Sequence, residues 1–167
     1  GPCGDTKTTS IQVINLANTT ITSINPLCLT ASPITLTAAM PGVIWSGTGI
    51  TDPIAGIFNP AVADIGVHTI TYTISGNCGN SSTQNNTVLA MPIANFSGTN
   101  LFGCGPLTTT ISNLNPVANS TVNWTLNGTN TSNLTTGFSQ TFTVPGCYTI
   151  GMTVTDINGC TSSTVLN

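Results

Sequence analysis

The chain has 167 residues but very few charged ones: Lys7 is the only cation, and the acids are Asp5, Asp52, Asp64 and Asp156. A single lysine cannot replace the counterions that surround a nucleic acid, so the composition excludes nucleic acid as a partner. No apolar run approaches the ~18 residues of a membrane-spanning helix, so we expect no membrane span.

Short β-strand signals, rich in Val, Ile and Thr and separated by Gly, Pro, Asn and Asp, follow one another along the whole chain. In the first half the expected strands are residues 10–16, 20–24, 33–39, 43–47, 68–75 and 83–90. In the second half they are residues 93–98, 108–114, 121–128, 140–144, the alternating part of 144–160, and 161–167. No segment has a sustained helical period, so the sequence predicts an all-β fold.

One sequence pattern occurs more than once in the chain. VPGCYTIGMTVTDINGC at 144–160 has an earlier copy, IGVHTITYTISGNC at 65–78, and residues 1–13 read like residues 76–88. In the two longer copies apolar residues alternate with threonine, which is typical of a strand with one buried face. The chain therefore resembles a portion of a repeating array.

The spacing of the copies predicts the size of the modules. Cys3 and Cys78 are 75 residues apart, and Cys78 and Cys160 are 82 apart. Such periods are too long for a solenoid and suit immunoglobulin-like β-sandwich modules, of which we expect two in tandem. The predicted boundaries are 1–16 for the terminal strand of a preceding repeat or a donor strand, 17–90 for the first module and 91–167 for the second.

Each module places a tryptophan between two cysteines. The order is Cys28, Trp45, Cys78 in the first module and Cys104, Trp124, Cys160 in the second. Because the pairs flank the Trp strand in matching positions, we predict disulfides from Cys28 to Cys78 and from Cys104 to Cys160. Both tryptophans are expected in module cores, as in related sandwiches.

Two cysteines remain, Cys3 and Cys147. Cys3 aligns with the final strand of a preceding module, so we expect its partner, the equivalent of Cys28, upstream in the array. The counterpart of Cys147 in the first module is Val67, so the module pattern supplies Cys147 with no mate. Cys147 is either a half-buried free thiol or forms an intermolecular disulfide, with a Cys3 equivalent as a candidate partner. Six cysteines in so short a chain predict an oxidising, extracellular setting.

The residues also resemble known families. CGPLTTTISN at 104–113 and TVPGCYTIGMTVTDINGC at 143–160 look like the polycystic-kidney-disease-type (PKD) repeat of secreted Bacteroidota proteins. The first module, with LCLTASPITLTA, WSGTGITD and IGVHTITYTI, is similar to immunoglobulin-like modules of giant adhesins of gliding bacteria. This resemblance implies type IX secretion, display on the cell surface and an adhesive or stalk role connected with gliding motility.

One segment departs from that family. PKD-type repeats commonly read Trp-Asp-Phe-Gly-Asp-Gly, whereas this chain reads WTLNGT at 124–129. Both acidic positions are lost, so no ion or ligand role attached to them carries over. We expect a core tryptophan followed by an Asn-Gly turn instead.

Candidate catalytic and metal-binding residues are few. His68 is the only histidine, and we expect it to be exposed and structural, since no nucleophile, base and orienting group can be assembled around it. The sequence thus predicts neither an enzyme nor a cofactor. Calcium is the alternative, at Asp64 or Asp156 in turns, although a lone Asp in a turn usually caps its own backbone.

The sequence therefore predicts a structural repeat segment of a secreted cell-surface adhesin or filament stalk, with a spacing and mechanical role. Its partners would be neighbouring repeats and, on an adhesive surface, glycans. A carbohydrate-binding accessory module of a secreted enzyme is one alternative, in which exposed aromatics bind sugar. The other is a self-assembling fibre subunit, in which residues 1–16 complete a neighbour's sheet by strand addition.

Overall fold

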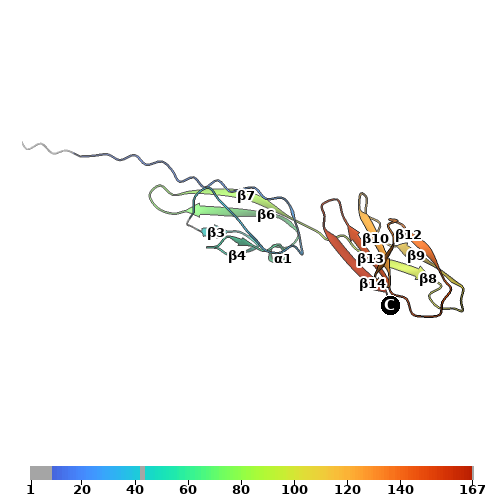
Figure 1. Cartoon of the computed structure of the whole chain (residues 1–167). Helices are drawn as coiled ribbons and strands as arrows, with labels where there is room; N and C mark the ends of the chain where they lie inside the picture. Colours follow the sequence, from blue (N-terminus) through green and yellow to red (C-terminus); the bar gives the residue numbers. More distant parts are fainter. Residues whose placement is uncertain (1–8, 42–43, 167) are drawn as a thin grey trace, which may run out of the picture. The chain divides into compact units, whose positions relative to one another are not determined.

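The computed structural model describes residues 9–41 and 44–166, and nearly all regular structure in these ranges is β (Figure 1). The described chain divides into two compact units. The first contains residues up to Asn25 together with Ser32–Thr87, and the second contains Pro26–Ala31 together with the residues from Val88 onward. In the described ranges, no helix is long and apolar enough to cross a membrane.

The first unit is built from short strands and two long ones. They are β2 (Ile34–Thr35), β3 (Ile44–Ser46), β4 (Ile50–Asp52), β5 (Ile57–Phe58), β6 (Gly66–Ile74) and β7 (Asn80–Leu89). One sheet has the order β2-β5-β4, and the other has the order β1-β7-β6-β3, where β1 is Leu27–Cys28. The two long strands match the predicted strands at 68–75 and 83–90.

The core of the first unit follows the alternation of β6. Ile70 and Tyr72 point inward and are buried, and the Tyr72 ring lies 4.5 Å from that of Trp45, measured between ring centroids. Trp45 comes from β3, which pairs antiparallel with β6. Phe58 from β5 is buried in the same unit. A period of two with one apolar face thus builds this core, as the sequence predicted.

One short helix, α1 (Pro60–Ala63), was not predicted. Asn59 caps it by accepting a hydrogen bond from the Ala61 amide, and Pro60 occupies the first turn, where its missing N–H costs nothing. Four residues are too few to produce a helical period in the sequence, so the pattern could not indicate this helix.

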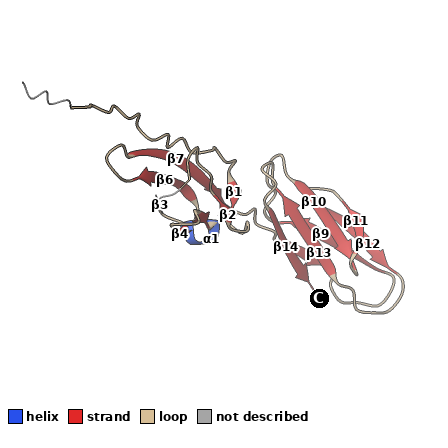
Figure 2. Ribbon diagram, turned by 60° about the vertical axis from the view of Figure 1, so that its left-hand side comes forward, coloured by secondary structure: helices blue, strands red, loops and turns tan. Residues whose placement is uncertain are grey.

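The second unit is a sandwich of two antiparallel sheets (Figure 2). Its strands are β8 (Phe96–Thr99), β9 (Leu107–Asn113), β10 (Thr121–Leu126), β11 (Thr129–Ser132), β12 (Gly137–Phe142), β13 (Ile150–Thr155) and β14 (Thr161–Leu166). One sheet has the order β11-β10-β13-β14 and the other β12-β9-β8. The core lies between them, because Trp124 and Met152 of the first sheet cluster with Ile111 of the second.

The WTLNGT segment forms the expected turn. Asn127 and Gly128 both have positive φ, of 48° and 80°, and Leu126 pairs with Thr129 across the β10–β11 hairpin. Asparagine and glycine are the residues that adopt this conformation at least cost, so the hairpin explains the sequence that replaces the acidic positions of the family.

Residues 10–16 were predicted as a strand, and the structure contradicts this prediction. Residues 9–20 have no assigned strand, and side chains on both faces of the segment, such as Val13 and Ile14, are exposed. A strand needs a neighbour to receive its backbone hydrogen bonds, and the described chain provides none here. The segment has the composition of a strand without a sheet to join.

A six-residue segment, Pro26–Ala31, belongs to the second unit although the chain on either side of it belongs to the first. It contains β1, which pairs parallel with the end of β7, Leu27 opposite Val88 and Cys28 opposite Leu89. The Leu29 amide also donates to the Leu89 carbonyl at 3.0 Å. This pairing fixes where Cys28 lies.

Candidate functional site

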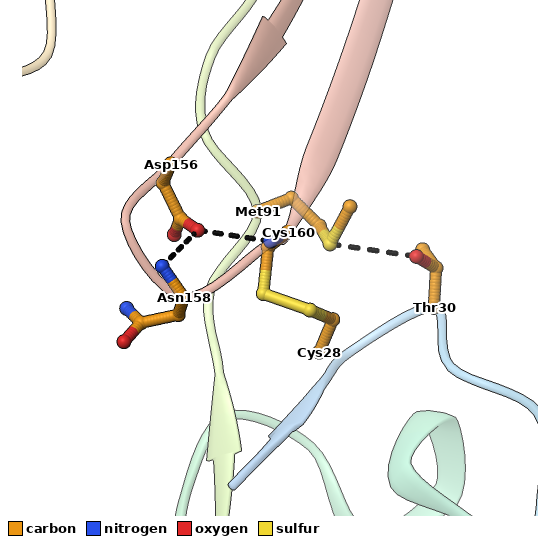
Figure 3. The surroundings of a disulfide bond; sticks show 6 residues. All are labelled: Cys28, Thr30, Met91, Asp156, Asn158 and Cys160. Atoms are coloured by element: carbon orange, nitrogen blue, oxygen red, sulfur yellow. Dashed lines mark hydrogen bonds between the residues drawn. A yellow bond between two sulfur atoms is a disulfide. The ribbon is translucent and has the colours of Figure 1, made fainter. Parts of the chain in front are cut away.

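Among the described residues there is one disulfide, between Cys28 and Cys160, with an S–S distance of 2.02 Å and Cα atoms 5.5 Å apart (Figure 3). Cys28 is presented by β1, and Cys160 lies in the turn between β13 and β14. Cys160 is fully buried. The bond closes a covalent loop between residues 132 positions apart in the sequence.

Both predicted pairings, Cys28 with Cys78 and Cys104 with Cys160, are wrong. Cys78 and Cys104 are free in the structure. The physical reason is the position of Pro26–Ala31: this segment packs in the second unit, which brings Cys28 within bonding distance of Cys160. The repeat spacing aligns these positions between modules, but it does not show which unit receives the segment.

The turn that carries Cys160 is ordered by Asp156. Its Oδ1 accepts hydrogen bonds from the backbone amides of Asn158 and Cys160, both at 2.9 Å, as the dashed lines of Figure 3 show. On the other side of the disulfide, the Thr30 hydroxyl donates to the Met91 sulfur at 3.4 Å. Hydrogen bonds to Asp156 therefore order the turn that carries Cys160, and the Thr30 contact joins the segment after Cys28 to Met91.

The acidic side chains and His68 serve local structure. Asp64 Oδ1 accepts from the Ile65 amide at 2.8 Å, so both candidate calcium ligands, Asp64 and Asp156, cap turns. His68 was expected to be exposed, but it is half-buried, shares the inward parity of Ile70, and its Nε2 lies 2.8 Å from the Asp64 carbonyl oxygen. Among the described residues, no three His, Cys, Asp or Glu side chains gather into a group that could hold a metal ion.

Both tryptophans are core residues, as predicted. Trp45 is 5% exposed and Trp124 is 0% exposed, and the Trp124 indole N–H donates to the Leu134 carbonyl at 2.8 Å. Tyr72 is buried as well. These side chains cannot offer their faces to a sugar. Phe102, which the sequence analysis did not single out, is in contrast 93% exposed.

Phe102 belongs to an apolar groove of about 730 Å³ on the second unit. The groove lies beside the β9, β12 and β14 strands and is lined mainly by Leu101, Phe102, Cys104, Val144, Cys147 and Leu166. Cys104 and Cys147 are both exposed free thiols at this groove. Cys147 is more exposed than the half-buried thiol we expected, and Cys3 lies outside the described residues. No periodic signal marks the groove, because many of its residues, among them Phe102, Cys104 and Cys147, come from loops.

The third free thiol is in the first unit. Cys78 lies in the turn between β6 and β7 and is half-buried, with its Sγ 3.9 Å from the carbonyl oxygen of Ile14. The Ala17 amide donates to the Cys78 carbonyl at 2.9 Å, and the Asn80 side chain donates to the Ala17 carbonyl at 3.1 Å. The segment that leads into the first unit therefore runs along the Cys78 turn.

Among the described residues, the second unit contains a disulfide and an apolar groove with two exposed free thiols, and the first unit contains one further free thiol. The disulfide fits an oxidising, extracytoplasmic setting. No family model matches the sequence, and a search of curated proteins found no significant match.

Proposed function

We propose that this chain is a structural segment of a secreted cell-surface adhesin or filament stalk, built from immunoglobulin-like and PKD-like modules, whose role is to space and to bear load. The strand order of the second unit supports this reading. Its first, second and fifth strands form one sheet, and its third, fourth, sixth and seventh form the other. Immunoglobulin-like sandwiches likewise have the first, second and fifth strands in one sheet and the third, sixth and seventh in the other, and the fourth strand here takes the place of C′ beside the third.

The observation that carries the proposal is the route that tension takes through the covalent structure. When the chain is pulled from its two ends, the shortest covalent path runs from residue 1 to Cys28, across the disulfide to Cys160, and on to residue 167. The residues between Cys28 and Cys160 form a closed loop that tension cannot extend. Ser32–Thr87 of the first unit and residues 88–160 of the second unit lie inside this loop.

The consequence is a segment of nearly fixed length. With the disulfide intact, unfolding releases only residues 1–27 and 161–167, a contour length of about 120 Å at full extension. Without the disulfide, the 132-residue separation adds about 450 Å. A stalk that must not lengthen when its binding tip is pulled gains from such a limit.

Force spectroscopy of the whole chain, held at its two ends, tests the proposal. We expect the extension of the oxidised protein to stop at the short contour length, and reduction or Cys28→Ser to release the additional length. Cys147→Ser is the matched control, because it removes a thiol and leaves the disulfide. Extension of the oxidised wild-type protein to the full contour length would overturn the proposal.

A second candidate, a fibre subunit that assembles by strand addition, is favoured by residues 10–16. Ile11, Val13, Ile14 and Leu16 are all exposed, in a segment with strand composition and no strand partner in the described chain. An exposed apolar segment of this kind is suited to complete the sheet of a neighbour. Deleting residues 1–16 should then abolish polymerisation in light scattering while leaving circular dichroism of the two units intact; polymerisation without this segment would contradict the candidate.

A further inference from the structure

Two structural features bring Cys28 and Cys160 together, and the first is a pairing of strands. The short strand β1 runs parallel to the end of β7, with Leu27 opposite Val88 and Cys28 opposite Leu89. Val88 lies on the buried face of β7, together with Asn86, and is only 1% exposed. The second part is a turn between two long strands, which presents Cys160 to the sulfur of Cys28.

The first unit contains the counterparts of Cys160, Val88 and Leu89. Cys78 corresponds in the repeat to Cys160 and lies in the equivalent turn, between β6 and β7. Val13 and Ile14 correspond to Val88 and Leu89. The sulfur of Cys78 lies 3.9 Å from the Ile14 carbonyl oxygen, so thiol and segment are neighbours.

Nothing in the described chain takes the position of β1 here. Val13 is 91% exposed, whereas its counterpart Val88 is 1% exposed. The edge at Val13 and Ile14 has no strand partner in residues 9–41 and 44–166, and the adjacent thiol is free. The first unit therefore has an exposed segment without a strand partner, at Val13 and Ile14, beside the free thiol of Cys78.

The second unit contains the counterpart of Cys28, which is Cys104. Cys104 corresponds in the repeat to Cys28, is free and exposed, and lines the apolar groove with Leu101, Phe102 and Leu166. Leu166 ends β14, the last strand of this unit, just as Leu89 ends β7. Cys104 thus lies near the end of a last strand, as Cys28 does.

We propose that copies of this chain join head to tail through a disulfide between Cys104 of one copy and Cys78 of the next, with Val13 and Ile14 of the second copy seated against the apolar groove of the first. The link repeats between copies the arrangement that Cys28 and Cys160 make within one. Donor and acceptor lie on different surfaces, so the contact is heterologous and propagates into an open chain.

The lack of charge favours a second copy as the occupant of the groove. The groove is lined largely by apolar side chains, and the described part of the segment that would enter it, residues 9–16, contains no charged residue. Docking therefore buries apolar surface on both sides without desolvating a charge. The inference rests on the proposed role as one link of an array, and it adds the residues that join the links.

Bond formation requires an oxidant, which we take to be a low-molecular-weight disulfide such as oxidised glutathione. The Cys104 thiolate attacks this disulfide, forms a mixed disulfide and releases one glutathione thiolate. The Cys78 thiolate of the next copy attacks the Cys104 sulfur and releases the second. Two protein thiols thus lose two protons and two electrons, and one glutathione disulfide becomes two thiols.

Two complementary variants of the whole chain test the link, both in a background with Cys3→Ser and Cys147→Ser. One adds Cys78→Ser and keeps Cys104, and the other adds Cys104→Ser and keeps Cys78. In a glutathione redox buffer, each alone should stay monomeric on a non-reducing gel. The mixture should form a dimer of one copy of each, which reductant dissolves, and peptide mapping should find Cys78 joined to Cys104.

The groove and the segment are tested by the rate of dimer formation. Phe102→Asp in the copy that keeps Cys104, or Val13→Asp in the copy that keeps Cys78, should slow dimer formation about tenfold, because each replaces buried apolar surface by a charge. Leu134→Asp and Val67→Asp are the matched controls, since both residues are exposed and lie outside the proposed contact. Neither control should change the rate.

Three results would overturn the link: no dimer in the mixture, a dimer in either variant alone, or equal slowing by the control substitutions. These results are independent of the proposed spacer function, because the force experiment uses a single copy and its internal disulfide. A failed link with a short oxidised contour length would leave the spacer function intact. The reverse outcome would retain the link and remove the spacer function.

Discussion

Replacing Trp124 by alanine should remove most of the stability of the second unit. Its side chain is fully buried between the two sheets, in edge contact with the rings of Phe96 and Phe138, and its N–H is bonded to the Leu134 carbonyl. The cavity from a Trp→Ala change costs about 3 to 5 kcal/mol. The Leu134 carbonyl that loses its donor adds about 1 kcal/mol.

Small domains have about 5 to 15 kcal/mol in total, so this loss leaves the second unit marginal. Trp124→Phe is the matched control, because it keeps most of the ring and loses chiefly the hydrogen bond, at about 1 to 3 kcal/mol. Trp45→Ala serves as the corresponding change in the first unit.

Hydrogen exchange read by mass spectrometry is the suitable assay, because it reports on each unit separately. In Trp124→Ala, amides of β10 and β13 should exchange about a thousandfold faster, since every 1.4 kcal/mol is a factor of ten. Trp45→Ala should instead act on β3 and β6. If Trp124→Ala left exchange in β13 within tenfold of wild type, the account of this core would be wrong.

Three further predictions concern turns and ions. Gly56→Ala should lower the free energy of unfolding of the first unit by about 2 kcal/mol or more, and with it the urea midpoint, because Gly56 has a φ of 70° and an added Cβ would lie 2.6 Å from the Trp45 Nε1. An unchanged midpoint would refute that packing. Asp156→Ala should destabilise the second unit by about 1 to 2 kcal/mol, while Asp156→Asn, which keeps an acceptor oxygen for the Cys160 amide, should cost less; equal losses would show that these hydrogen bonds contribute little. Calcium should leave the melting temperature unchanged in calorimetry, since Asp64 and Asp156 cap turns, and a rise would indicate a bound ion.

The sheets and their cores could be predicted from the sequence, because a period of two records which face is buried. Ile150, Met152 and Val154 share one parity and are all buried, as their alternation with threonine predicted. Trp45 and Trp124 were recognised as core residues by their matched places within strands. The Asn-Gly pair likewise predicted its hairpin.

The partner of Cys28 could not be predicted in the same way. Its position is set by β1, a strand of two residues, and by parallel pairing with β7, neither of which leaves a periodic pattern. The segment 26–31 packs in a unit other than the one its sequence neighbours occupy. Local sequence patterns predict local structure, whereas the unit in which residues 26–31 pack depends on tertiary contacts with residues far along the chain.

The apolar groove escaped prediction for a related reason, and the sequence indicated an unpartnered segment at residues 1–16 only through the donor-strand alternative. Phe102 lies in a loop, and Val13 lies in a segment with the alternation of a strand, so each looks like an ordinary buried residue in sequence. Their exposure becomes visible only when the sheets are assembled and no neighbour covers them. This mismatch between composition and burial is what indicates a partner.

The most direct test of the account is the disulfide connectivity of the native protein, because both the load path and the proposed link depend on it. The chain has one lysine and no arginine, so trypsin produces too few peptides. Pepsin is suitable, because the low pH at which it works also suppresses thiol–disulfide exchange. Mass spectrometry of the unreduced digest should find the Cys28 peptide joined to the Cys160 peptide. Cys28 joined to Cys78, with Cys104 joined to Cys160, would contradict the account.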